Sequence, residues 1–188
     1  MIKGEQTKNK VIETAGDLFW KNGYANTGIS DILKVADIPK GSFYFHFKKK
    51  SDVAEAVIQY YAHQTLDVLR TAAAQSTGWN LFCDSFLVAF QQELKDKSCY
   101  GCPLAVLGME LAFQDPTLAG EYSNAIANLK DIFAEVLEKE GIFGERQQKL
   151  AELSTAIYEG NLLLHRISKE QSWIEKMNQQ LKAILSLP

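Results

Sequence analysis

Hydroxyl and ammonium groups gather between residues 27 and 50 of this 188-residue sequence. Lysine ammoniums and the hydroxyls of threonine and tyrosine bind phosphate oxygens, so this composition is typical of a surface that meets a nucleic-acid backbone. The predicted phosphate contacts are Thr27, Tyr44, Lys48 and Lys50. Lys40 and Ser42 are the candidates for base edges, since lysine suits the acceptor atoms of guanine. The stretch therefore predicts contacts with both the phosphates and the bases of DNA.

Four further residues complete this predicted interface. Gly28 and Gly41 are small, and a missing side chain at Gly41 lets the backbone approach a base pair closely. Phe43 suits either a thymine methyl group or the hydrophobic core, and both interpretations stay open. His46 suits either a phosphate contact or a surface position with no role.

Two short helices must position these groups. Apolar residues recur at helical spacing on one face of the first helix, at Ile29, Ile32, Leu33 and Ala36. Thr27 is the predicted N-cap of this helix, because its hydroxyl can accept a hydrogen bond from an orphan backbone N–H. Pro39 is predicted at the first position of the second helix, where its missing N–H costs nothing. Two helices joined by a turn of about 3–4 residues form a helix-turn-helix, here at about residues 27–47.

The same stretch resembles the helix-turn-helix of the TetR-type transcriptional regulators. The residues that carry the resemblance are Gly23-Tyr24, Thr27, Ile29, Asp31-Ile32, Lys40 to Tyr44, Phe47 and Lys50. The sequence departs from the family at Asp37, where glycine is usual, at Pro39, and at Phe45-His46, whose order is reversed. The resemblance implies DNA-binding roles for Thr27, Lys40, Ser42, Phe43, Tyr44 and Lys50. It also implies a pocket for a small-molecule inducer among the helices that follow.

Composition and charge favour an all-α chain that meets DNA at one end. With 46% apolar residues, four prolines and no persistent strand-like alternation, an all-α fold with a sizeable core is predicted. Residues 1–50 carry nine lysines against five acidic residues, a net charge of +4. The remaining residues carry 11 basic and 18 acidic groups, a net charge of −7. Because a basic region suits phosphate, this asymmetry supports double-stranded DNA as the partner of the N-terminal part.

Other classes of protein find little support in the sequence. No run of about 18 apolar residues occurs, so no contact with a membrane is expected. The first ten residues lack the apolar run of a signal peptide, and a cytoplasmic location is expected. No Ser–His–acid arrangement and no Gly-rich phosphate loop is present, so we expect no enzyme and no cofactor.

Large rings recur in the helices after residue 76. They are core residues by default, but an apolar cavity with a few polar groups also suits a small hydrophobic ligand. The candidate ligand-binding residues are Trp79, Phe82, Phe86, Phe90, Cys102, Phe113, Tyr122, Phe133 and Tyr158.

Three cysteines are present, and two of them form a Cys99-x-x-Cys102 pair. Such a pair suits redox chemistry or half of a metal site. A metal site needs more ligands, and Cys83 and the three histidines are scattered, so no metal is predicted. The segment from Gly101 to Ala112 is similar to one in a subgroup of the family with members that respond to electrophiles. A small buried cysteine at a helix start is the preferred interpretation.

The last two predicted helices, at about residues 145–167 and 168–187, carry apolar stripes that must be covered. Pairing with a second copy of the chain in a four-helix arrangement would cover them. The candidate dimer contacts are Leu153, Ile157, Leu164, Trp173, Met177, Leu181 and Ile184.

These observations predict a DNA-binding domain at residues 4–50 and a ligand-binding and dimerisation domain at residues 51–188. The expected function is that of a repressor that binds a near-palindromic operator as a homodimer. A small, largely apolar inducer would release it. The alternatives are a repressor that senses redox state or electrophiles through cysteine, and a helical ligand-binding protein with no regulatory role.

Overall fold

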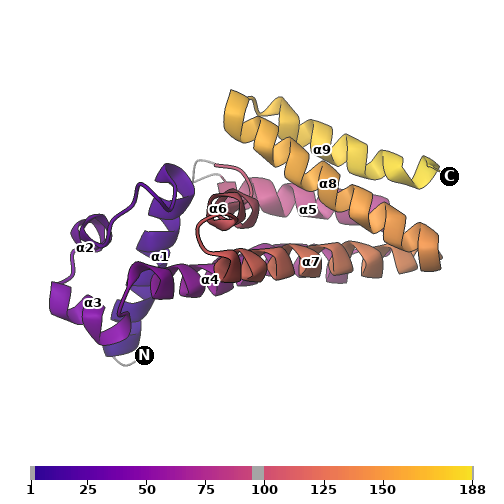
Figure 1. Ribbon diagram of the computed structural model, residues 1–188. Helices are drawn as coiled ribbons and strands as arrows, with labels where there is room; N and C mark the ends of the chain where they lie inside the picture. Colours follow the sequence, from indigo (N-terminus) through magenta and orange to yellow (C-terminus); the bar gives the residue numbers. More distant parts are fainter. Residues whose placement is uncertain (1–2, 95–99, 188) are drawn as a thin grey trace. The chain divides into compact units, whose positions relative to one another are not determined.

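The computed structural model describes residues 3–94 and 100–187 and is all-α across them, as the sequence predicts (Figure 1). These residues form nine α-helices and a final 3-10 turn. The helices are α1 (Lys3–Asn22), α2 (Ile29–Ala36), α3 (Lys40–His46), α4 (Lys50–Gln75), α5 (Trp79–Leu94), α6 (Pro103–Leu111), α7 (Pro116–Glu138), α8 (Gly144–Ser168) and α9 (Ser172–Ala183), followed by η1 (Ile184–Ser186).

The chain divides into two compact units. The first unit comprises Met1–His63 and Pro103–Ala125, and the second unit comprises Gln64–Cys102 and Ile126–Pro188. The predicted DNA-binding domain, residues 4–50, lies wholly inside the first unit. That unit also contains helix α6, which follows residue 50 by more than fifty positions.

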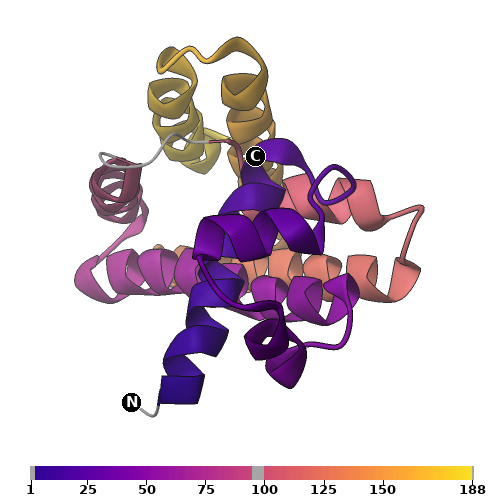
Figure 2. The same ribbon diagram turned by 90° about the vertical axis from the view of Figure 1, so that its left-hand side faces the viewer.

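Helix α1 supplies the apolar face on which the rest of the helix-turn-helix packs. Val11, Ala15 and Phe19 recur at a spacing of four residues and are fully buried. Helices α2 and α3 both contact α1, and Figure 2 shows the three close together. Helix α1 ends at Asn22 and is followed by Gly23, whose φ of 90° lies in the left-handed region that glycine adopts without strain.

The ends of α2 and α3 differ in detail from the prediction. Gly28, one residue after Thr27, is the N-cap of α2, and its N–H donates to Asp31 Oδ2 at 2.8 Å. The prediction of Thr27 as N-cap is therefore wrong by one position. Asp37 ends α2 with a φ of 49°, which aspartate tolerates better than most residues. Pro39 is the N-cap of α3, one position before the predicted place.

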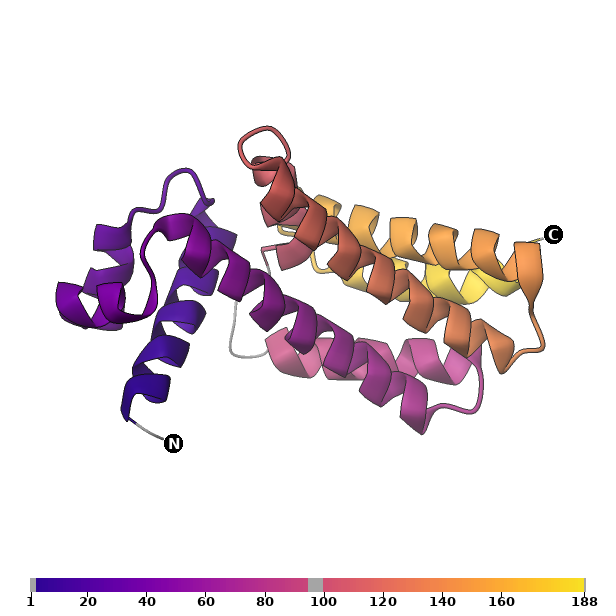
Figure 3. The same ribbon diagram turned by 60° about the horizontal axis from the view of Figure 1, so that its bottom comes forward.

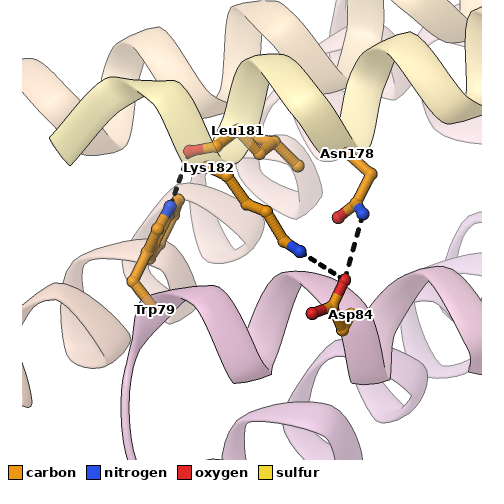
Figure 4. A network of polar contacts seen from close by, with 5 residues as sticks. All are labelled: Trp79, Asp84, Asn178, Leu181 and Lys182. Carbon is orange, nitrogen blue, oxygen red and sulfur yellow. Dashed lines mark hydrogen bonds and ion pairs between the residues drawn. The ribbon is translucent and has the colours of Figure 1, made fainter. Parts of the chain in front are cut away.

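The second unit is organised around α5, α8 and α9. Helices α8 and α9 lie side by side (Figure 1, Figure 3), and α9 also contacts α5. The buried indole of Trp79 on α5 donates its Nε1–H to the carbonyl oxygen of Leu181 on α9, at 2.6 Å. One helical turn further along α5, the Asp84 carboxylate pairs with Lys182 at 2.6 Å and accepts from Asn178 at 3.2 Å (Figure 4). The contact between α5 and α9 thus combines a buried hydrogen bond with a partly exposed ion pair.

Candidate nucleic-acid interface

Helix α3 presents different residues on its two faces. Phe43 and Phe47, four residues apart, are buried on the inner side, with ring centroids 5.8 Å apart. Tyr44 and Phe45 point outward, with 44% and 82% of their surface exposed. Lys40 is also exposed and lies 5.7 Å above the Tyr44 ring. The outer face of α3 therefore offers a cation, a hydroxyl and an apolar ring, which suits the edges and backbone of duplex DNA.

The turn after α3 adds exposed cations. Lys48 and Lys49 are exposed, and their backbone N–H groups donate to Asp52 Oδ2 at 2.9 and 3.2 Å. Asp52 lies in the first turn of α4, where a carboxylate stabilises the helix and satisfies orphan N–H groups. Because the two lysines bond Asp52 only through their backbone N–H groups, these bonds fix the turn and leave both lysine side chains exposed.

Phe43 and Thr27 are placed differently from the prediction. The Phe43 ring is fully buried, so of the two interpretations that the sequence left open, the core interpretation is correct. Thr27 is 2% exposed, and its hydroxyl donates to the carbonyl oxygen of Gly23 at 2.9 Å. The hydroxyl is thus bonded within the loop between α1 and α2 and is not presented to solvent.

Lys50 also faces this loop. Its Nζ donates to the carbonyl oxygens of Tyr24 and Thr27 at 2.9 and 3.2 Å, and it lies 4.1 Å above the Tyr24 ring. Partial burial lowers the pKa of Lys50, and the nearby Glu110 carboxylate opposes that shift. Through these two hydrogen bonds, Lys50 stabilises the loop between α1 and α2.

The remaining predicted residues are exposed or half-buried. Gly41 is exposed on α3, and Ser42 and His46 are half-buried. Gly28 is half-buried at the N-cap of α2. The His46 ring meets the Phe45 ring edge-on at 4.9 Å, so it supports that exposed side chain.

Sequence reasoning missed Phe45 as a candidate contact. Once Phe43 and Phe47 are assigned to the buried side, a residue two positions from each must lie on the opposite side of a helix, at 3.6 residues per turn. The exposed cation Lys34 and the 61% exposed Val35, both on α2, were missed as well. The sequence alone does not distinguish Lys34 and Val35 from ordinary surface residues.

The structure brings six of the predicted ligand-binding rings together in the second unit. Ring centroids lie 5.5 to 6.2 Å apart in the pairs Trp79–Phe82, Trp79–Phe133, Phe82–Phe133, Phe82–Phe86, Phe86–Phe90 and Phe86–Tyr158. Tyr122 is buried in the first unit. Phe113, also in the first unit, is 96% exposed. A ring in that position lines no enclosed pocket, so the prediction for Phe113 is corrected.

The predicted dimer residues separate into a buried and an exposed group. Met177, Leu181 and Ile184 are at most 1% exposed within their own chain, so a partner cannot contact them, and their assignment is corrected. Leu153 and Leu164 on α8 are 37% and 41% exposed, and Ile157 and Trp173 are half-buried. Two more exposed apolar residues of α8, Leu163 and Ile167, were not predicted.

The cysteines that the structure describes are both buried. Burial raises the pKa of the Cys83 thiol to about 12. Cys102 lies beside the Glu159 carboxyl, whose pKa burial raises to about 7 and whose contact with the thiol works in the opposite direction. Cys99 lies outside the described residues. No group of three metal-ligating side chains is found in the described parts of the chain.

Both parts of the chain match transcriptional regulators in comparisons with known proteins. Residues 11–57 match the family described as bacterial regulatory proteins, tetR family, and residues 82–180 match the C-terminal domain of LmrA/YxaF-like transcriptional regulators. The chain is 25% identical to the regulator LmrA of Bacillus subtilis over 179 residues, covering 88% of this chain and 89% of that protein. It is 26% identical to a regulator from Lactococcus lactis over 182 residues, covering 94% and 91%.

Solved structures show the same fold. A TetR-family regulator from Agrobacterium tumefaciens has a TM-score of 0.85 at 19% identity, covering 96% of this chain and 98% of its own. The reduced form of Escherichia coli NemR has a TM-score of 0.77 at 23% identity, covering 95% and 96%. The chain belongs to the TetR family of helix-turn-helix transcriptional regulators, and it is a DNA-binding protein rather than an enzyme. None of its described helices combines the length and apolarity needed to cross a bilayer.

Proposed function

We propose that this regulator is a repressor that binds a near-palindromic operator as a homodimer in the cytoplasm. The outer face of α3 carries the proposal, because Lys40, Tyr44 and Phe45 are exposed together on a helix held by Phe43. In this arrangement Tyr44, Lys48 and Lys49 contact phosphates, while Lys40, Ser42 and Phe45 meet base edges. Residues 4–50 form the DNA-binding domain in this proposal, and residues 51–188 bind the ligand and the second copy.

The salt dependence of binding tests the phosphate contacts. A duplex that the full-length protein selects from a random-sequence library serves as the probe. The double variant Lys48→Ala/Lys49→Ala should bind it more weakly, and the slope of log K against log salt should fall by about 2, since each neutralised phosphate contributes about 0.9. Lys149→Ala, an exposed lysine of the second unit, is the matched control and should keep the slope. An unchanged slope in the double variant would remove Lys48 and Lys49 from the interface.

The exposed apolar residues of α8 support dimerisation. Leu164 and Ile167 are exposed to solvent in a single chain. In a dimer, each copy would cover these apolar side chains of the other. A dimer places two copies of α3 in successive major grooves about 34 Å apart. Leu164→Glu/Ile167→Glu should sediment as a monomer, whereas Leu81→Glu, an exposed control on α5, should not change the sedimentation coefficient. A dimer that survives the double substitution would place the interface elsewhere.

A small, largely apolar inducer is the proposed signal. The ring cluster of the second unit supports an apolar ligand, because six aromatic side chains gather there. Native mass spectrometry of the purified protein should detect a co-purifying small molecule, and adding that molecule back should release the selected duplex. Cysteine sensing is disfavoured for Cys83 and Cys102, since both thiols are buried and a carboxyl lies beside Cys102.

A further inference from the structure

The loop between α1 and α2 is held by side chains from outside the helix-turn-helix. Lys50, at the start of α4, donates to the carbonyl oxygens of Tyr24 and Thr27. From the other direction, Glu110 on α6 accepts the backbone N–H of Ala25 at its Oε2, at 3.2 Å. The bond joins residues 85 positions apart within the first unit. The loop is therefore fixed through both its carbonyl oxygens and an N–H group.

The backbone at Gly23 fits this contact closely. A Cβ added to Gly23 would lie 2.7 Å from Glu110 Oε1, a distance that real Cβ atoms do not tolerate. Because the clashing atom is the end of a flexible side chain, a Cβ at position 23 would displace the Glu110 carboxylate from the loop. Glu110 also attracts Lys50, which raises the pKa of that lysine against the effect of burial. Glu110 therefore binds the loop directly and also attracts Lys50, the other side chain that holds the loop.

Two costs attach to a carboxylate at this position. Glu110 lies in the last turn of α6, where the helix dipole disfavours an anion. It also adds a negative charge to the unit that must approach DNA phosphates, which weakens binding by long-range repulsion. The helix dipole and the repulsion from DNA thus favour a neutral residue there, whereas the bond to the Ala25 N–H and the attraction to Lys50 offset these costs.

We propose that Glu110 is a positioning residue for DNA binding. Its carboxylate holds the α1–α2 loop in the conformation from which α2 starts at Gly28, and α2 leads directly into α3. Helix α6 is in this sense a working part of the DNA-binding unit, although it lies far beyond the helix-turn-helix in sequence. Glu110 itself touches no DNA.

The direction of the change in DNA affinity distinguishes this positioning role from a purely electrostatic role. In the full-length protein, Glu110→Ala should bind the selected duplex roughly tenfold more weakly, as expected for the loss of one charge-assisted hydrogen bond. The same substitution removes a negative charge and would strengthen binding if charge alone mattered. Glu110→Lys extends the contrast, since it should also bind more weakly despite its added positive charge. Glu121→Ala, an exposed carboxylate of the same unit, is the control and should bind at least as well as the unchanged protein, because it removes the same charge without the bond to the loop.

Rescue and hydrogen exchange distinguish positioning from general stability. Glu110→Gln keeps an acceptor oxygen for the Ala25 N–H and should bind within about threefold of the unchanged protein. The Ala25 amide should exchange faster in Glu110→Ala and Glu110→Lys, and near the original rate in Glu110→Gln. Equal or tighter DNA binding by Glu110→Ala or Glu110→Lys, with unchanged exchange at Ala25, would overturn the proposal. So would a Glu110→Gln protein that binds as weakly as Glu110→Lys.

A double-mutant cycle tests the contact from the loop side. Gly23→Ala should weaken DNA binding, because the new Cβ displaces the Glu110 carboxylate and the left-handed φ becomes strained. Since the contact is then already broken, adding Glu110→Ala should weaken binding no further. Fully additive losses would mean that Glu110 acts independently of the loop, contrary to the proposal.

Discussion

The two units of this protein use polar and aromatic groups in opposite ways. In the first unit, the loop before α2 is fixed by polar bonds to its backbone from Thr27, Lys50 and Glu110, while two rings on the outer face of α3 are exposed to solvent. In the second unit, five of the six clustered rings are buried, and the ion pair of Asp84 and Lys182 is partly exposed.

The two kinds of interaction differ in how strongly they depend on geometry, and this explains why each unit uses a different one. Apolar burial stabilises roughly in proportion to area and has little direction, so it suits a unit whose task is to hold together. Hydrogen bonds depend on distance and angle, so they suit a loop that must deliver a helix in one orientation. The comparison predicts that ring removal costs stability in the second unit and DNA affinity on the outer face of α3.

The largest expected effect is in the ring cluster of the second unit. Trp79→Ala should lower the free energy of unfolding by about 3–5 kcal/mol, because a fully buried indole and its bond to Leu181 are lost. Urea unfolding measures the change. Leu81→Ala on the same helix, at a 48% exposed position, is the control and should cost below about 1 kcal/mol. Similar losses in both variants would contradict the comparison.

A buried carboxyl of the same unit should make stability depend on pH. Burial raises the pKa of Glu159 from 4.5 to about 7, so the folded state keeps a proton that the unfolded state releases between these values. Stability from this group is therefore fully present below pH 4.5 and is lost as pH rises through 7, by roughly 3 kcal/mol in total.

Glu159→Gln should remove this dependence and unfold at higher urea than the unchanged protein at pH 8. Glu152→Gln, an exposed carboxylate on the same helix, should leave the pH profile as it is. Parallel profiles for Glu159→Gln and the unchanged protein between pH 5 and 8 would show that this carboxyl is not the titrating group.

On α3 the comparison predicts the reverse of the Trp79 result. Phe45→Ala should leave the free energy of unfolding within about 0.5 kcal/mol, since the ring is 82% exposed. It should weaken binding to the selected duplex by about 1–2 kcal/mol, through lost apolar contact with base edges. Phe43→Ala, at the buried neighbour, should instead lower stability. Anisotropy titrations and urea unfolding of both variants decide between the two roles.

The smallest effect is expected at the edge of the second unit. The Lys182 and Asn178 hydrogen bonds lower the pKa of Asp84, so its contribution is present above the ordinary value of 3.8 and is lost as pH falls. Because the pair is largely exposed, Asp84→Asn should cost below about 1 kcal/mol at neutral pH and less in high salt. Thermal unfolding at two salt concentrations measures this. A loss as large as that of Trp79→Ala would mean that the polar edge, rather than the rings, holds α9 on α5.

Sequence periodicity was sufficient for the helices and for much of the surface of α3. The recurrence of Val11, Ala15 and Phe19 every four residues marks a buried stripe because 3.6 residues complete one turn. Tyr44 and Lys48 were predicted because hydroxyl and ammonium groups suit phosphate, and Lys40 because lysine suits base edges; all three are exposed. Motif spacing identified the helix-turn-helix for the same reason, since its caps and turns involve neighbours in sequence.

What the sequence by itself determined about this protein was therefore local: its helices, its helix-turn-helix and the asymmetry of its charge. The tertiary structure decided which side chains remain available. It buried Thr27, turned Lys50 onto a loop, covered Met177 and Leu181, and left Phe113 in solvent. It also brought Glu110 to Ala25 across 85 positions. Such contacts depend on how helices pack against one another, and that packing is not encoded in the spacing of neighbouring residues.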